Sequence, residues 1–363
     1  MALSCGIVGL PNVGKSTIFN ALTNAGAESA NYPFCTIDPN VGIVPLRDPR
    51  LERIAGIVQA KTTIYSTVEF VDIAGLVKGA SKGEGLGNKF LANIRETDAI
   101  AHVVRCFDDD NIIHVEGSID PIRDAEIIST ELMIADIEAL DRRHHKEAKV
   151  ARGGDKDAKA LVDLIERFQA ALNEGLPART VEITREEEPF AKILHLITQK
   201  PLLFVANTAE PTEENAYVEK VRALAASENA EMVILSGKME AEIMEIEEEE
   251  ERTMFLEELG LSETGLDRLS KAAFDLLAMQ TYFTAGEKEA RAWNIRKGWK
   301  APQAAGVIHT DFEKGFIKAE IYSCEDLFAG GSESALKSAG KMRLEGKEYV
   351  MQDGDVVHFR FNV

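Results

Sequence analysis

The run Gly9-Leu10-Pro11-Asn12-Val13-Gly14-Lys15-Ser16 fits the phosphate-loop pattern G-x-x-x-x-G-K-[ST]. The apolar run at 2–8 before it predicts a buried strand, and Ile18, Ala21 and Leu22 after it predict a helix. A strand, a glycine loop and a helix N-terminus together form a nest of backbone N–H groups for phosphate, which the helix dipole reinforces. The pattern therefore predicts a triphosphate site on an α/β sheet.

The side chains of this loop are expected to divide the work on a bound triphosphate. Lys15 would reach the β- and γ-phosphates and act in catalysis, and the Ser16 hydroxyl would be a ligand of Mg²⁺. Gly9 and Gly14 allow the backbone to approach the phosphates closely. Further nucleotide contacts are expected from Asn12, Val13, Gly14 and Thr17.

The segments around the loop alternate between strand-like and helix-like patterns. Strands are expected at 41–46, 67–73, 99–107, 201–207 and 231–236, and a helix at 88–97. This alternation predicts an α/β domain with a mostly parallel sheet, split between residues 1–120 and 199–279.

The intervening residues 121–198 have a different character. Residues 122–150 contain no Gly or Pro, and a second apolar stripe follows the interruption at Gly153-Gly154-Asp155. The stripes consist of Ile127, Ile134, Ile137 and Leu140, then Leu161, Leu164, Ile165, Phe168 and Leu172. They predict an inserted antiparallel helical hairpin. The hairpin is either a packing spacer or an arm that meets a partner, and the basic residues near its tip fit both interpretations.

The last part of the chain, residues 280–363, is expected to form a separate small α+β domain. Short runs at 304–309 and 356–361 predict strands, and Gly-Asp and Gly-Gly turns separate such runs. Acidic and basic residues balance in this segment, so the first part of the chain carries the whole net charge of −20.

Charge and cysteine content limit the class of protein. A net charge of −20 argues against a general DNA binder and against adsorption to anionic membranes. The four cysteines are scattered without metal spacing, which is typical of buried or free thiols in a reducing cytosol. With no leader pattern and no apolar run of bilayer length, we expect a cytoplasmic protein.

Two further segments are expected to reach the phosphates and the metal. Asp72-Ile73-Ala74-Gly75 ends a predicted strand, so Asp72 would hold Mg²⁺ through water and the Gly75 N–H would sense the γ-phosphate. Thr36 would complete the metal shell, unless it is an ordinary loop threonine. Leu76 stands where many GTPases carry a water-orienting glutamine, so the intrinsic turnover should be slow.

The predicted strand at 201–207 ends in Asn207-Thr208-Ala209-Glu210, where a GTPase would carry N-K-x-D. An aspartate there accepts the N1–H and N2–H₂ of guanine, and Glu210 is one methylene too long for this. Asn207 can serve either purine through N7. Thr208 is expected to contact the base, although it lacks the long lysine stem that covers a base in N-K-x-D. Ser236, after the next strand, would lie beside the base. Without an aspartate that accepts both of these hydrogen bonds, the site should lose its selectivity for guanine. This favours ATP as the nucleotide.

These segments together resemble the YchF, or Obg-like ATPase, subfamily of translation-factor GTPases. The matching segments are Gly9–Ser16, 31–36, 72–88, Asn207–Glu210 and the β-rich C-terminal part. The resemblance implies a P-loop G domain split by a helical hairpin, followed by a ubiquitin-like (β-grasp) TGS domain. It also implies a preference for ATP, association with ribosomes, and, from the residue matching Asn12 in some relatives, a potassium ion.

We therefore expect a slow ATPase that works as a conformational switch at the ribosome. The alternatives are a GTPase with relaxed base specificity and a nucleotide-gated adaptor whose hydrolysis is incidental. His114 is the candidate for positioning the attacking water, or else a surface histidine. Basic residues interleaved with Trp293 and Trp299 would contact ribosomal RNA, unless both tryptophans serve packing.

Overall fold

The computed structural model describes residues 3–27, 40–73 and 86–362. Its first sheet has the strand order β2-β4-β1-β5-β6-β7, in which β2 is antiparallel to β4 and the other neighbours are parallel. The strands are β1 (Leu3–Val8), β2 (Val41–Leu46), β4 (Ser66–Asp72), β5 (Ala99–Arg105), β6 (Leu202–Asn207) and β7 (Glu231–Leu235). The predicted mostly parallel sheet is confirmed.

Helices accompany these strands, and all of them except α9 (Glu249–Glu258) bury apolar residues. In the first of them, the predicted residues Ile18, Ala21 and Leu22 are all buried. The helices are α1 (Lys15–Ala27), α3 (Leu86–Glu96), α7 (Ala216–Ser227), α8 (Gly237–Met244), α9 (Glu249–Glu258) and α10 (Gly265–Leu276). Cys5 and Cys106 are buried free thiols of this core, and Cys324 is one in the C-terminal part.

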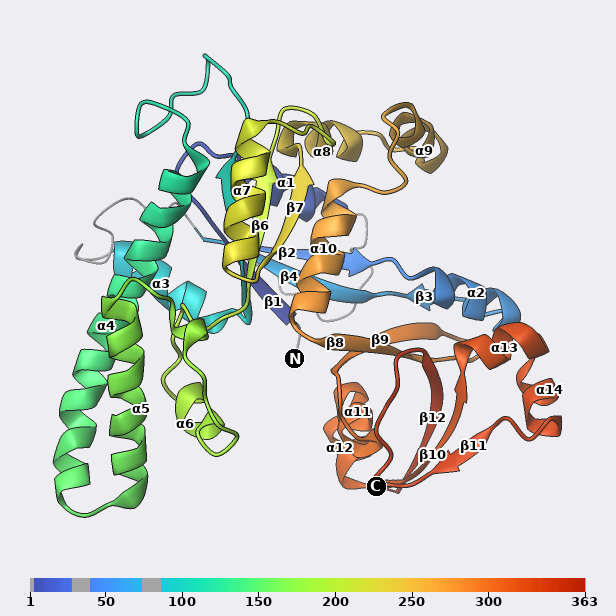
Figure 1. Ribbon diagram of the computed structural model, residues 1–363. Helices are drawn as coiled ribbons and strands as arrows, with labels where there is room; N and C mark the ends of the chain where they lie inside the picture. Colours follow the sequence, from blue (N-terminus) through green and yellow to red (C-terminus); the bar gives the residue numbers. More distant parts are fainter. Residues whose placement is uncertain (1–2, 28–39, 74–85, 363) are drawn as a thin grey trace.

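The helical hairpin consists of α4 (Pro121–Arg152) and α5 (Lys156–Asn173), and it projects from the sheet (Figure 1). All five residues of the predicted second stripe are buried in a core that also contains Leu140. At the tip, Gly154 has φ +91° and Asp155 accepts a hydrogen bond from the Ala158 N–H at 2.8 Å, which starts α5. A short return segment with η2 (Ala178–Thr180) and α6 (Glu188–Lys192) leads back to β6.

The C-terminal sheet has the order β11-β10-β12-β8-β9-β3. Its central strands β8 (Met279–Thr284) and β12 (Asp355–Phe361) are parallel, and β9 (Ala290–Arg296) and β10 (Phe316–Ser323) flank them antiparallel. Parallel first and last strands in the centre are the β-grasp arrangement that was expected. The remaining elements are α11 (Ala301–Ile308), α12 (Thr310–Lys314), α13 (Cys324–Gly330), α14 (Glu333–Ser338) and β11 (Arg343–Glu345).

The strand predicted at 304–309 is wrong, because these residues lie almost wholly within helix α11. Pro302 occupies the first turn of the helix, and the Gln303 side chain accepts a hydrogen bond from the Lys300 N–H at 2.9 Å. Ala301, Ala304 and Ala305 are buried against the sheet. Small buried residues let the helix pack closely, and this outweighs the β-branched Val307 and Ile308.

A segment of the first part of the chain packs against the second sheet. Helix α2 (Pro49–Val58) places Leu51 and Ile54 in one core with Phe283, and β3 (Thr63–Ile64) pairs in parallel with β9. The predicted domains do not anticipate this contact, because they place residues 1–120 in the α/β domain and residues 280–363 in a separate one. The chain therefore leaves β2, packs onto the C-terminal sheet and returns as β4, and it passes to the C-terminal sheet again from α10 to β8 (Figure 1).

No helix in the described ranges is both long enough and apolar enough to cross a bilayer.

Candidate nucleotide-binding site

The phosphate loop lies between β1 and α1, as the sequence predicts. Gly9 (φ +153°), Asn12 (φ +63°) and Gly14 (φ +97°) adopt backbone angles that favour glycine or asparagine. A Cβ on Gly14 would lie 2.1 Å from Asn207 Nδ2, so only glycine fits there. The Ile18 N–H donates to the Gly14 carbonyl at 3.0 Å, which leaves the first N–H groups of α1 without helical partners.

Lys15 is only 6% exposed, and its ammonium donates to the Leu10 carbonyl at 2.7 Å. Burial lowers the pKa of Lys15 to about 8, and the negative charge of Asp72 opposes this shift. Ser16 and Thr17 are exposed in the first turn of α1, where a ligand has access to their hydroxyls. The loop thus holds its ammonium in place before any phosphate arrives.

Asp72, at the end of β4, has an unusual carboxylate. Its Oδ1 is buried and has no hydrogen-bond partner among the described residues. Burial raises the pKa of Asp72, and the Lys15 ammonium opposes the shift. A buried carboxylate oxygen without a donor, which interacts with Lys15 of the phosphate loop, and the exposed Ser16 hydroxyl of that loop are oxygen ligands that suit a hard cation such as Mg²⁺. The other predicted metal and phosphate contacts, Thr36 and Gly75, lie outside the described residues.

The Asn207 side chain joins β6 to the phosphate loop and to α8. Its Nδ2 donates to the Val13 carbonyl at 2.8 Å, and its Oδ1 accepts from the Gly237 N–H at 2.9 Å. Asn207 is 4% exposed, and one of its two amide hydrogens remains for a base. Sequence reasoning assigned Asn207 to the base only, so this second role, which fixes the loop, was missed.

Thr208 and Ser236 shape the turn after β6. The Thr208 hydroxyl lies 2.7 Å from the Glu210 carbonyl, and the Ser236 hydroxyl donates to the Ala209 carbonyl at 2.8 Å. Thr208 is 2% exposed and Ser236 is fully buried. Their hydroxyls are committed to backbone groups, which does not favour the predicted side-chain contacts with a base. Glu213, which sequence reasoning also missed, accepts from the Ala209 N–H at 3.1 Å and thereby holds the same turn.

Arg105 closes β5 and anchors the loop that follows. The residue is 1% exposed, and its guanidinium donates to the carbonyls of Phe107, Asp109 and Ile112 at 3.0–3.1 Å. Asn12 Nδ2 in turn donates to the Ile113 carbonyl at 3.1 Å, so the anchored loop touches the phosphate loop. A single arginine at the end of an apolar strand was the sequence signal for this anchor.

His114 lies in the loop that Arg105 anchors. Its Nε2 is 2.8 Å from Asp124 Oδ2, and its Nδ1 accepts from the Glu116 N–H at 3.1 Å. Since Nδ1 is an acceptor, Nε2 carries the proton and donates to Asp124. The His114 side chain is 6% exposed, which makes the surface-histidine alternative wrong, and both ring nitrogens have partners. In this arrangement the ring is not free to hold a water molecule.

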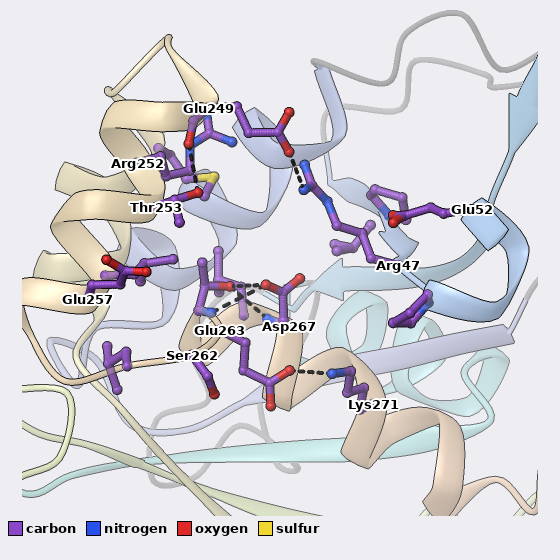
Figure 2. Close-up of a pocket in the computed structure, with 18 residues that line it drawn as sticks. Arg47, Glu52, Glu249, Arg252, Thr253, Glu257, Ser262, Glu263, Asp267 and Lys271 are labelled. Carbon is purple, nitrogen blue, oxygen red and sulfur yellow. Dashed lines mark hydrogen bonds and ion pairs between the residues drawn. The ribbon is translucent and has the colours of Figure 1, made fainter. Parts of the chain in front are cut away.

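A cavity of about 530 Å³ lies elsewhere, between the end of β2, α9 and the start of α10 (Figure 2). No residue of the phosphate loop lines it. Several of its charged side chains pair with one another: Arg47 with Glu249 at 3.0 Å, and Lys271 with Glu263. We assign no ligand to this cavity, because the basic groups of Arg47 and Lys271 already pair with carboxylates of the same lining.

Two family models match the chain. Residues 4–136 match the model described as "50S ribosome-binding GTPase". Residues 279–362 match a model of the YchF GTPase C-terminal domain, which is described as a protein of unknown function.

Curated relatives match over the whole chain. A protein of Bacillus subtilis (strain 168) named ribosome-binding ATPase YchF is 58% identical, with all of both chains covered. A protein of the same name from Escherichia coli O157:H7 is 55% identical, again with all of both chains covered.

The structure of the Schizosaccharomyces pombe YchF GTPase matches with a TM-score of 0.89 and 40% identity, covering 99% of this chain and 97% of that one. The match extends over both sheets and the hairpin, and the phosphate loop, Asp72 and Asn207 lie together in the described part of the chain. This chain belongs to the YchF family.

Proposed function

We propose that this chain is an ATPase that binds ATP in preference to GTP and hydrolyses it slowly as a conformational switch. The bacterial relatives are named ATPases and the S. pombe structure is titled a GTPase. These names differ in the base of the nucleotide, adenine or guanine. The turn after β6 is the observation that supports a preference for ATP. Thr208 is buried where N-K-x-D has lysine, Glu210 replaces the aspartate, and Glu213 holds the turn.

The loop between β1 and α1 would bind the phosphates with backbone N–H groups, and Lys15 would turn from the Leu10 carbonyl to the β- and γ-phosphates. Ser16 and Asp72 would hold Mg²⁺, with Thr36 as a further ligand. When bound, the metal neutralises charge on the phosphates. Hydrolysis would release the segments around Thr36 and Gly75.

A potassium ion beside the phosphates would supply further positive charge, with Asn12 Oδ1 as a ligand. The Asn12 amide nitrogen is bonded to the Ile113 carbonyl, and this fixes the side chain. No described residue donates to its Oδ1 atom. Replacing potassium by sodium should lower turnover in the native chain and change it less in Asn12→Ala.

His114 would position the attacking water, as we predict from the sequence. Because both ring nitrogens are engaged, the bond between His114 and Asp124 must open when ATP binds. His114→Ala should then abolish turnover while ATP still binds, and Asp124→Asn should weaken the restraint and retain turnover. Unchanged turnover in His114→Ala would refute this role.

The relatives' printed names support a ribosomal partner for this chain and hence a place in the cytoplasm. Trp293 is half-buried, donates to the Thr284 hydroxyl at 3.0 Å and lies under the Arg291 guanidinium at 4.0 Å. This favours packing for Trp293, while Arg296 and Lys297 are exposed for contact with ribosomal RNA. Co-sedimentation with ribosomes through a salt series should show nucleotide-dependent binding that weakens with salt.

Two variants distinguish a conformational switch from an adaptor whose hydrolysis is incidental. Lys15→Ala removes ATP binding, and His114→Ala keeps ATP bound. A switch needs both states, so both variants should fail to complete the cycle of ribosome binding and release. If His114→Ala supports function fully, the adaptor is correct.

A further inference from the structure

We propose that a cavity between the G-domain sheet and the base of the hairpin binds a neutral, partly apolar small molecule that hydrogen-bonds to His102. The cavity has a volume of about 380 Å³ and lies between β5, α4, α7 and the segment that follows α5. Ile100, Leu132, Leu202 and Leu224 supply apolar wall. This size and lining are typical of small-molecule sites.

His102 is the polar group that points to a ligand. It is 2% exposed, lies in the middle of β5 and stacks on Phe204 with ring centroids 5.5 Å apart. Neither ring nitrogen has a hydrogen-bond partner in the described part of the chain. Buried polar side chains almost always have one, so the ring lacks a partner that the cavity can hold.

The imidazole is neutral, since burial lowers the pKa of His102 to about 3 and the Arg179 charge adds to the effect. A neutral ring offers one donor and one acceptor. The matching ligand therefore carries an amide, hydroxyl or ring N–H group on an apolar body.

The charges at the rim exclude ionic ligands. Arg179 pairs with Glu228 and donates to the Thr198 carbonyl at 3.3 Å, so its guanidinium is committed. Glu126 adds a second carboxylate to the lining, which leaves a net negative rim and disfavours phosphate and other anions. A cation would meet only the neutral His102 ring inside the cavity, since the Glu228 carboxylate at the rim is already paired with Arg179, and its buried charge would stay uncompensated. A neutral molecule remains.

The wall opposite the sheet is held firmly. Asp136 is fully buried and accepts from the N–H groups of Ile197 and Thr198 at 2.9 and 2.8 Å. The Ala178 N–H donates to the Thr198 hydroxyl at 3.1 Å. These bonds tie the return segment of the hairpin to α4, so the cavity is formed in advance, and its occupant would touch both the hairpin and the sheet.

The test uses the full chain with ¹⁵N-labelled histidine, since it has only 7 histidines. Benzamide is the probe, toluene lacks its polar group, and benzoate and benzylamine carry charge. Benzamide should shift the His102 ring resonances with a millimolar dissociation constant, the range for a ligand of this size. Toluene, benzoate and benzylamine should bind at least tenfold more weakly.

Two variants make the test specific. His102→Phe keeps the stacking on Phe204 and removes the nitrogens, and should weaken benzamide binding at least tenfold in a competition or calorimetric titration. Ser129→Trp narrows the cavity from α4 and should abolish the shift of the intact His102. His145→Phe, an exposed position on the hairpin, is the matched control and should bind as the native chain does.

The proposal is overturned if no neutral probe shifts His102 at millimolar concentration, because the cavity then holds only water. Equal benzamide binding in native and His102→Phe chains would also overturn it. If His102→Phe does not fold, the Ser129→Trp result alone decides.

Discussion

Two buried polar residues on β5, Arg105 and His102, show opposite solutions to the same problem. Arg105 is 1% exposed and has three backbone carbonyls as acceptors, whereas His102 is 2% exposed and has no partner among the described residues. The protein itself supplies acceptors for the Arg105 guanidinium, and these bonds fix a loop beside the phosphate loop. It leaves His102 facing a cavity, and an unsatisfied group of this kind indicates a ligand.

The largest effect is expected from Arg105→Met. The change leaves the Phe107 and Ile112 carbonyls without a donor among the described residues, and the Asp109 carbonyl keeps only the Ile112 N–H, so the free energy of unfolding should fall by about 3 kcal/mol or more. Urea unfolding measures this. The control is Arg222→Met, because Arg222 is an exposed partner of Glu214 and should cost less than about 1 kcal/mol. Equal loss in both variants would remove the contrast.

Asn207→Ala should have the next largest effect. The Val13 carbonyl and the Gly237 N–H lose their partner, which should cost about 2 kcal/mol of stability. Because the phosphate loop loses its brace, ATP affinity should fall roughly tenfold or more. Calorimetric titration with ATP checks this, and full ATP affinity in the variant would show that the brace does not position the loop.

The pH dependence of ATP binding tests the buried ammonium of Lys15. Its pKa is lowered to about 8, so the ammonium is charged below that pH and is lost as the pH rises through it. ATP affinity should therefore fall above pH 8, by at most about tenfold per pH unit. Lys15→Arg stays charged, and its affinity, whatever its size, should be flat over the same range. A flat profile for the native chain would contradict the lowered pKa.

His102→Phe should have the smallest effect on stability. The ring loses no hydrogen bond and keeps its stacking, so the free energy of unfolding should change by less than about 1 kcal/mol. Urea unfolding beside Arg105→Met gives the sharpest form of the comparison. A loss as large as that of Arg105→Met would mean that His102 has a structural partner after all.

Local patterns predicted much of this molecule. The phosphate loop, the alternating elements and the second hairpin stripe depend on residues close in sequence, and each appears where it was expected. The run 304–309 misled because its β-branched residues favour a strand, whereas Pro302 and the buried alanines that make it a helix act through packing.

The contacts that complete the site could not be predicted in this way. The Asn207 brace, the loop anchor at Arg105 and the packing of Leu51 against the C-terminal sheet join residues far apart in sequence. The His102 cavity is a further case, since nothing local distinguishes an unpaired histidine from one that the core satisfies.

A phosphate loop of the kind found in GTPases serves ATP here, because the turn after β6 lacks the aspartate that accepts both hydrogen bonds from guanine. Competitive titration of the native chain with ATP and GTP, in the presence of Mg²⁺, tests it directly. We predict that ATP binds at least tenfold more tightly than GTP. GTP binding as tightly as ATP would contradict this preference.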